Sequence, residues 1–208
     1  MSIETTRLIQ APTTRVITAP EIVTGRRAML RGAGIIGLSA AAVAVLGGCE
    51  SMAASNSATA ADVDILNVAL GLEHEAINAY QLGAESGLLQ EPALQVAVAF
   101  QGHHKAHRDA LVSTIQKLGG KPVAEKSMND YATALNAGSL KNQGDVLHLA
   151  ARLEKGAANA YLGVIPAFND QGLAQVAGRL AADETMHWTA LASALGEQLP
   201  SKALTFGA

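Results

Sequence analysis

Apolar residues recur at steps of three and four residues in four stretches of the chain, which is the spacing of one face of an α-helix. The stripes cover residues 66–80, 97–118, 147–164 and 173–194. Pro92 stands where the second helix would begin, and Pro166 closes the third. Gly119-Gly120 and Gly196 mark the ends of the second and fourth. The pattern predicts an all-α fold built on four long helices.

The last two stripes repeat the first two. Residues 72–80 match residues 153–161 at an offset of 81, and residues 95–97 match residues 175–177 at an offset of 80. A duplicated helix pair buries its apolar face against its copy, so the repeat predicts a four-helix bundle made of two helix pairs. The helices within a pair are joined closely and should be antiparallel. Residues 119–143 are long enough for a crossover along the bundle, with a short helix around residues 128–135.

The N-terminal segment, residues 1–48, reads as an export signal. Arg26-Arg27 precedes an uncharged apolar stretch over residues 32–48. These residues fall short of the roughly 20 that span a bilayer as a helix, which is typical of a cleavable signal. The run from Thr24 to Leu30 resembles a twin-arginine signal, an address read by a receptor. We therefore expect an exported protein, located in the periplasm, that uses the twin-arginine export machinery.

Cys49 is the only cysteine, and it directly follows Leu46-Gly47-Gly48. This sequence looks like a bacterial lipoprotein box, in which the cysteine is acylated and becomes the new N-terminus. Cys49 is thus a candidate lipid anchor and the expected route to a membrane. The alternative is ordinary cleavage near residues 51–54, which would release a soluble periplasmic protein. Residues 49–61 are rich in Ser, Ala, Asn and Thr and predict a flexible linker. The bundle would follow over residues 62–197, and residues 198–208 would form a C-terminal tail.

Composition and charge exclude several classes of function. Residues 1–48 carry a net charge of +3, whereas the remaining residues carry −6. An acidic body repels phosphate backbones, so we expect no nucleic-acid partner. One cysteine excludes an internal disulfide and a Cys-rich zinc site. The sequence has no phosphate-binding glycine loop and no nucleophile elbow.

Metal-binding side chains occupy the apolar stripes, where an unpaired charge is costly. The six candidate ligands are Glu73, His104, His107, Glu154, Glu184 and His187. Glu184 and His187 form a Glu-x-x-His pair, whose i, i+3 spacing directs two donors the same way. Carboxylate and imidazole together favour iron or manganese, with zinc as the alternative. One such histidine would usually be a core residue; six donors on four helices predict a site for one or two metal ions.

These residues resemble the motif of the ferritin-like superfamily, and in particular its exported members. That family places one Glu on each of two helices and Glu-x-x-His on each of the other two. Glu73, Glu154 and the pair Glu184/His187 match the motif, but His104-x-x-His107 stands where a second Glu-x-x-His is expected. One bridging carboxylate is thereby replaced by imidazole, which bridges two ions poorly. We expect an asymmetric pair of ions or a single site on Glu154, Glu184 and His187.

Two functions remain open at this point. The resemblance implies an oxidoreductase of the di-metal carboxylate type that acts on ferrous iron or peroxide. The substitution at His104 instead suits a non-catalytic, stress-related envelope scaffold with a degenerate metal site. Tyr80 and Tyr161, each seven residues after its Glu, are interpreted as core packing. His103 and His74 lie one position off the stripes and are interpreted as outer or surface residues.

Overall fold

The computed structural model describes the backbone of residues 40–207 and the side chains of residues 56–207. Contacts divide the chain into a unit ending at Val43 and a unit over Ala44–Ala208, which holds the bundle. The helices are α1 (Ala40–Glu85), α2 (Glu91–Lys117), α3 (Met128–Ala134), α4 (Gln143–Val164) and α5 (Gln171–Ala194), with short 3-10 turns at Ala137–Ser139 and Ile165–Ala167. The described residues contain no strand, which confirms the predicted all-α fold.

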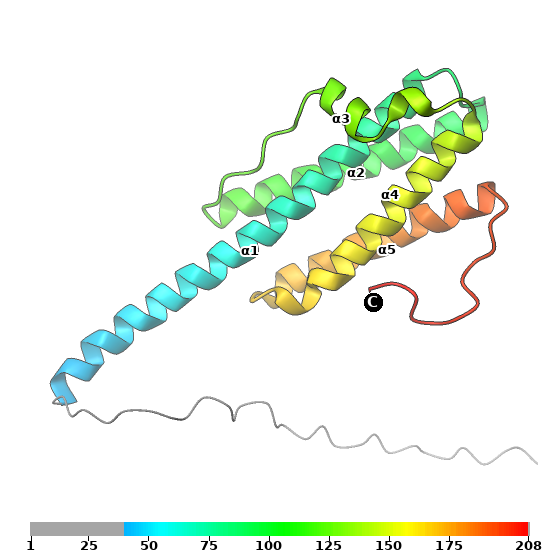
Figure 1. The fold of residues 1–208 in the computed structure, drawn as a ribbon. Helices are drawn as coiled ribbons and strands as arrows, with labels where there is room; N and C mark the ends of the chain where they lie inside the picture. The colour runs from blue at the N-terminus through cyan, green and yellow to red at the C-terminus, as the bar shows by residue number, and fades with distance from the viewer. Residues whose placement is uncertain (1–39, 208) are drawn as a thin grey trace, which may run out of the picture. The chain divides into compact units, whose positions relative to one another are not determined.

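The four long helices form two antiparallel pairs, α1 with α2 and α4 with α5 (Figure 1). The connection between the pairs runs beside α1. Asn67 anchors its start, because its Nδ2 donates to the carbonyl of Lys121 at 3.1 Å and its Oδ1 accepts from the amide of Val123 at 2.7 Å. Three turns further along α1, Asn78 donates to Glu125 Oε1 at 2.6 Å. The crossover therefore follows the length of the bundle, and its short helix α3 lies where the sequence predicted one.

Local sequence sets the helix ends. Ser127 and Asp130 form a reciprocal capping box at the start of α3. Asn142 accepts from the amide of Asp145 at the start of α4, and Asp170 accepts from two amides at the start of α5. Gly119 and Gly196 follow α2 and α5 with φ of +78° and +71°, a conformation that favours glycine.

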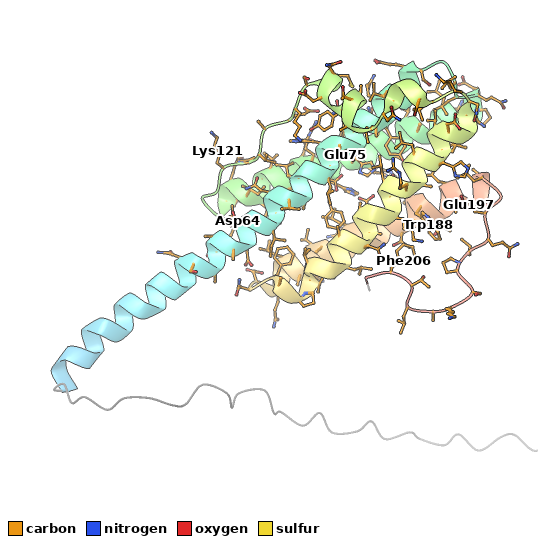
Figure 2. All side chains as sticks on the ribbon, in the orientation of Figure 1. Asp64, Glu75, Lys121, Trp188, Glu197 and Phe206 are labelled. Atoms are coloured by element: carbon orange, nitrogen blue, oxygen red, sulfur yellow. The ribbon has the colours of Figure 1, made fainter. Side chains whose placement is uncertain are left out.

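Two apolar clusters form the main core and lie on either side of the polar centre. One contains Leu70, Leu111, Tyr161 and Leu173, one from each of the four long helices. The other contains Phe100, Trp188 and Leu191 near the opposite end of the bundle. The C-terminal tail packs on this second cluster: the rings of Phe206 and Trp188 lie 5.2 Å apart, edge to face (Figure 2). The candidate ligands thus lie between two packed apolar layers.

The structure describes only part of the N-terminal segment, so it bears on only some of the predictions made for that segment. Helix α1 runs through residues 49–61, where the sequence predicted a flexible linker. Alanine, which has the highest helix propensity, recurs in this stretch and supports a helix without an apolar stripe. Arg26-Arg27 and the side chain of Cys49 lie outside the described residues. Among the residues that are described, no helix has the length and apolar character of a membrane span.

Candidate metal centre

The six predicted ligands come together in the middle of the bundle. Glu73 lies on α1, His104 and His107 on α2, Glu154 on α4, and Glu184 and His187 on α5. All six are buried, and the most exposed, His107, retains 8% of its surface. The stripes predicted this convergence, because donors at matching positions of four packed helices face the same central layer.

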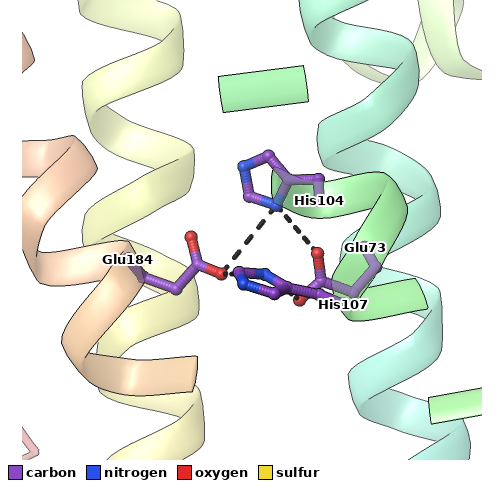
Figure 3. Close-up of side chains that lie close together, drawn as sticks. All are labelled: Glu73, His104, His107 and Glu184. Carbon is purple, nitrogen blue, oxygen red and sulfur yellow. Dashed lines mark hydrogen bonds and ion pairs between the residues drawn. The ribbon is translucent and has the colours of Figure 1, made fainter. Parts of the chain in front are cut away.

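The first group of donors contains Glu73, His104, His107 and Glu184 (Figure 3). Each residue offers one ligand atom, and these atoms lie within 4.8 Å of one another. His104 Nδ1 is 2.8 Å from Glu73 Oε2 and 3.8 Å from Glu184 Oε1. His107 Nδ1 is 3.2 Å from Glu184 Oε1 and 3.6 Å from Glu73 Oε1. Three helices thus supply two carboxylates and two imidazoles to one position.

The second group contains His104, Glu154, Glu184 and His187, again within 4.8 Å. His187 Nδ1 lies 3.3 Å from both Glu154 Oε2 and Glu184 Oε2. His104 Nε2 lies 3.1 Å from Glu154 Oε1. The two groups therefore share Glu184, which offers one oxygen to each, and His104, which offers one nitrogen to each. A neutral imidazole has a single lone pair, so His104 can bind an ion in one group at a time.

The two tyrosines contact the ligands across the repeat. Tyr80 donates to Glu154 Oε1 at 2.5 Å, and Tyr161 donates to Glu73 Oε1. Each tyrosine thus holds the carboxylate of the opposite helix pair. The interpretation of these residues as core packing is incomplete, because they also orient candidate ligands. The signal in the sequence is that a Tyr follows each stripe Glu by seven residues in both halves.

Two further side chains contact the outer nitrogens of the candidate histidines. His107 Nε2 lies 3.2 Å from Asp183 Oδ2, and His187 Nε2 lies 2.9 Å from His103 Nδ1. Asp183 and His103 are equivalent in the repeat, each directly preceding a residue of the centre. The offset of 80 would have indicated Asp183, which the stripe pattern alone does not. His74 is buried outside both groups of donors.

Burial and mutual hydrogen bonding shift the pKa values of the centre. Burial alone disfavours imidazolium, but the carboxylates beside the two rings outweigh it, and their proximity raises the pKa of His104 and His107 to about 10. Burial also raises the pKa of the Glu184 carboxyl. The pKa of Glu73 and of Glu154 instead falls, because bonding to the histidines outweighs their burial. Without metal, protons on the imidazoles therefore neutralise the buried carboxylates.

The donor set fits a metal ion. His107 Nδ1 and Glu184 Oε1 are buried without a hydrogen-bond partner, although they lie only 3.2 Å apart. An imidazole nitrogen and a carboxylate oxygen are both ligands of iron, manganese and zinc, so an ion at this position would satisfy the two atoms that make no hydrogen bond. The outer contacts to Asp183 and His103 are of the kind that fix the orientation of metal-bound histidines.

Comparison with known proteins agrees with the helical bundle. A family model described as a ferritin-like domain matches residues 61–197. The chain belongs to the ferritin-like domain family. Its fold is similar to a conserved hypothetical protein, rv2844, from Mycobacterium tuberculosis, with a TM-score of 0.56 and 19% identity over 71% of this chain and 99% of that one. That likeness concerns the fold alone. No curated protein matches the sequence.

Metal binding to this ferritin-like bundle should release protons and strengthen as the pH rises. His104 and His107 have pKa values of about 10 without metal, so each carries a proton at pH 7 that an ion must displace. Each displaced proton makes the apparent affinity rise about tenfold per pH unit below that pKa. Calorimetric titration of Mn²⁺ in buffers of different ionisation enthalpy measures the proton count. Binding without proton release at pH 7 would contradict this charge assignment.

Removing the outer partners of the histidines should weaken metal binding without changing the fold. We expect Asp183→Ala and His103→Ala each to lower the affinity by about 10–100-fold, because each loses a contact that orients a ligand. Competition with a coloured chelator measures the affinity, and circular dichroism checks the helices. Arg179→Ala, also on the exposed surface of α5, serves as the control and should bind as the native chain does. Equal affinities for all variants would show that these contacts play no part in binding.

Proposed function

We propose that this chain is an exported ferritin-like metalloprotein that holds iron or manganese and uses it to oxidise ferrous iron, with hydrogen peroxide as the electron acceptor that is reduced to water. One observation carries the proposal: six buried carboxylate and imidazole side chains from four helices converge, and two of their atoms make no hydrogen bond. A structural bundle would gain more from apolar residues at these positions, because buried charges cost free energy even when paired.

The residues of the candidate metal centre have different proposed roles. Glu73 and Glu154 would each bind one ion, and Glu184 would join the two positions, because its two oxygens face different groups. Iron or manganese supplies one-electron redox chemistry when bound by such carboxylate and imidazole ligands. Tyr80 and Tyr161 hold Glu154 and Glu73 in place. His103 and Asp183 are exposed while their partners are buried, so protons can pass between the centre and solvent along these contacts.

A rate measurement tests the proposed activity. The full chain, loaded with Fe²⁺ without oxygen, is mixed with hydrogen peroxide, and peroxide loss and iron oxidation are followed. We expect Glu184→Gln to lower the rate by about 100-fold or more, because one substitution alters both groups of donors. Glu75→Gln is the matched control, since Glu75 belongs to neither group. A native rate equal to that of free Fe²⁺ would refute the redox function.

His104 supports a second candidate function. It replaces the carboxylate that the ferritin-like motif has at this position, so two divalent ions would meet three carboxylates rather than four. The alternative is a non-catalytic envelope scaffold whose protonated histidines permanently neutralise the three carboxylates. Such a protein would contain no metal after reconstitution with iron, manganese or zinc.

Export is a separate proposal. It rests on the arginine pair, the uncharged stretch that follows and the position of Cys49. Fractionation of cells that express the native chain should place it in the periplasm, either bound to the membrane or soluble. Replacing both Arg26 and Arg27 with Lys should retain it in the cytoplasm, and Cys49→Ser should release it from the membrane. Membrane retention of Cys49→Ser would exclude the lipid anchor.

A further inference from the structure

A second site lies at the end of the bundle where α2 and α4 begin. A cavity of about 330 Å³ opens there between all four long helices, with Leu140 of the crossover as part of its wall. Among the residues that line it, Val96 is 41% exposed, whereas Ala97 and Leu191 are buried. This volume is within the range of roughly 300–1,000 Å³ that is usual for small-molecule sites.

The lining carries no charge. Every residue of the cavity wall is apolar or glycine except Tyr80, Gln90 and Gln143. The two glutamines are partly exposed and are joined, because the backbone amide of Gln90 donates to Gln143 Oε1 at 2.9 Å. A charged ligand would lose its hydration here without gaining a counter-charge. The wall therefore selects an uncharged molecule with a mainly apolar body.

The repeat explains why this end is hollow and the other is filled. At the opposite end, Leu173 and Val164 occupy the positions that correspond to Ala93 and Gly83 in the cavity wall. Leu173 is buried in the apolar cluster of that end. The same helix pair thus forms a packed core with large residues in one copy and a cavity with small residues in the other. Empty apolar cavities destabilise a core, which favours an occupant at this end.

Tyr80 connects the cavity with the metal centre. It lines the cavity and donates to Glu154 Oε1 at 2.5 Å. Its ring also stacks on His104 with centroids 5.5 Å apart. A molecule in the cavity would therefore contact a side chain that touches two candidate ligands.

We propose that this cavity is a binding site for an uncharged, mainly apolar organic molecule, which lies against Tyr80. The apolar body fills the space left by Ala93, and a single polar group can bond to Gln90 or Gln143 of the wall. Binding does not require the metal, so this site is independent of the proposed redox function. Its occupant is placed to influence the centre through Tyr80.

Titration of the full chain with 1-decanol, without metal, tests the site. We expect saturable binding of one molecule per chain. Ala93→Leu, which restores the residue of the packed copy, should weaken binding by about tenfold or more, because leucine occupies the space of the ligand. Ala194→Leu fills the cavity from α5 and provides a second test if Ala93→Leu does not fold. Ala99→Leu, on the exposed face of the same helix as Ala93 and outside the cavity, should bind normally.

Decanoate is the matched charged probe. It should bind at least about tenfold more weakly than 1-decanol at pH 8, because the wall offers no cation. Equal binding of the two probes, or equal binding by the native chain and both cavity-filling variants, would overturn the proposal. So would the absence of decanol binding together with self-association of the native chain that Ala93→Leu abolishes, since the cavity would then be covered by a second copy.

Discussion

Replacing Glu184 with Gln should remove metal from the whole centre, whereas replacing Glu73 or Glu154 should affect one position each. Glu184 belongs to both groups of donors, and its two oxygens face His107 on one side and His187 on the other. Gln keeps the size of Glu but loses the charge that balances the ions. We expect the affinity at both positions to fall by more than the 10–100-fold that the loss of an outer contact costs.

Elemental analysis of the full chain after reconstitution measures this result. A native chain with two ions should give two in the control Glu75→Gln, one in Glu73→Gln and Glu154→Gln, and none in Glu184→Gln. If the native chain holds only one ion, the variant that loses this ion, Glu73→Gln or Glu154→Gln, identifies the position at which it is bound. The double variant Glu184→Ala/His187→Ala should also be free of metal. A double variant that holds as much metal as the native chain would refute the assignment of these ligands.

The sequence predicts the fold well because its signals are local. The four long helices lie where the apolar stripes, the prolines and the glycines predicted them. A capping box begins α3 where the sequence predicted a short helix. The convergence of the six donors also follows, because residues at matching positions of packed helices must face the same layer. The match with the ferritin-like domain model supports the same bundle.

The sequence pattern does not predict which atoms of these side chains contact one another. The sharing of His104 and Glu184 between two groups depends on side-chain rotamers and on helix separation, which periodicity does not set. The bonds from Tyr80 and Tyr161 to carboxylates of the opposite pair are long-range, so no local pattern encodes them. The cavity near Ala93 is visible only as small residues in one copy of the repeat. The helical backbone over residues 49–61 differs from the expected linker because alanine propensity acts without an apolar stripe.

The charges of the centre make the chain without metal dependent on pH. The raised pKa of His104 and His107 contributes stability that is present below about pH 6.5 and is lost as the pH rises through about 10. The lowered pKa of Glu73 and Glu154 contributes stability that is present above about pH 4.5 and is lost as the pH falls through their folded values. The two effects overlap near neutral pH, where protonated histidines and ionised carboxylates hold one another.

Metal should therefore raise the melting temperature more at pH 9 than at pH 7, because an ion displaces the protons of His104 and His107 more easily as the pH approaches their pKa of about 10. An ion at about 1,000 times its Kd stabilises a folded protein by roughly 4 kcal/mol. For a chain of this size each kcal/mol shifts Tm by about 2–4 °C, which gives a rise of roughly 8–16 °C. Differential scanning fluorimetry of the full chain with and without Mn²⁺ or Fe²⁺ at pH 7 and pH 9 measures it.

The same experiment separates a working metal centre from a degenerate one. A scaffold in which His104 and His107 remain protonated partners of the carboxylates would melt at the same temperature with or without metal. The rise should disappear in Glu184→Gln and persist in Glu75→Gln, because only the first removes a shared ligand. A rise that persists in Glu184→Gln would place the stabilising ion elsewhere, and no rise in the native chain at either pH would favour the scaffold. His104 contacts carboxylates of both groups, and its imidazole can either neutralise two carboxylates or bind one ion, but not both. The melting temperature with and without metal therefore distinguishes a metal-binding centre from a scaffold without metal.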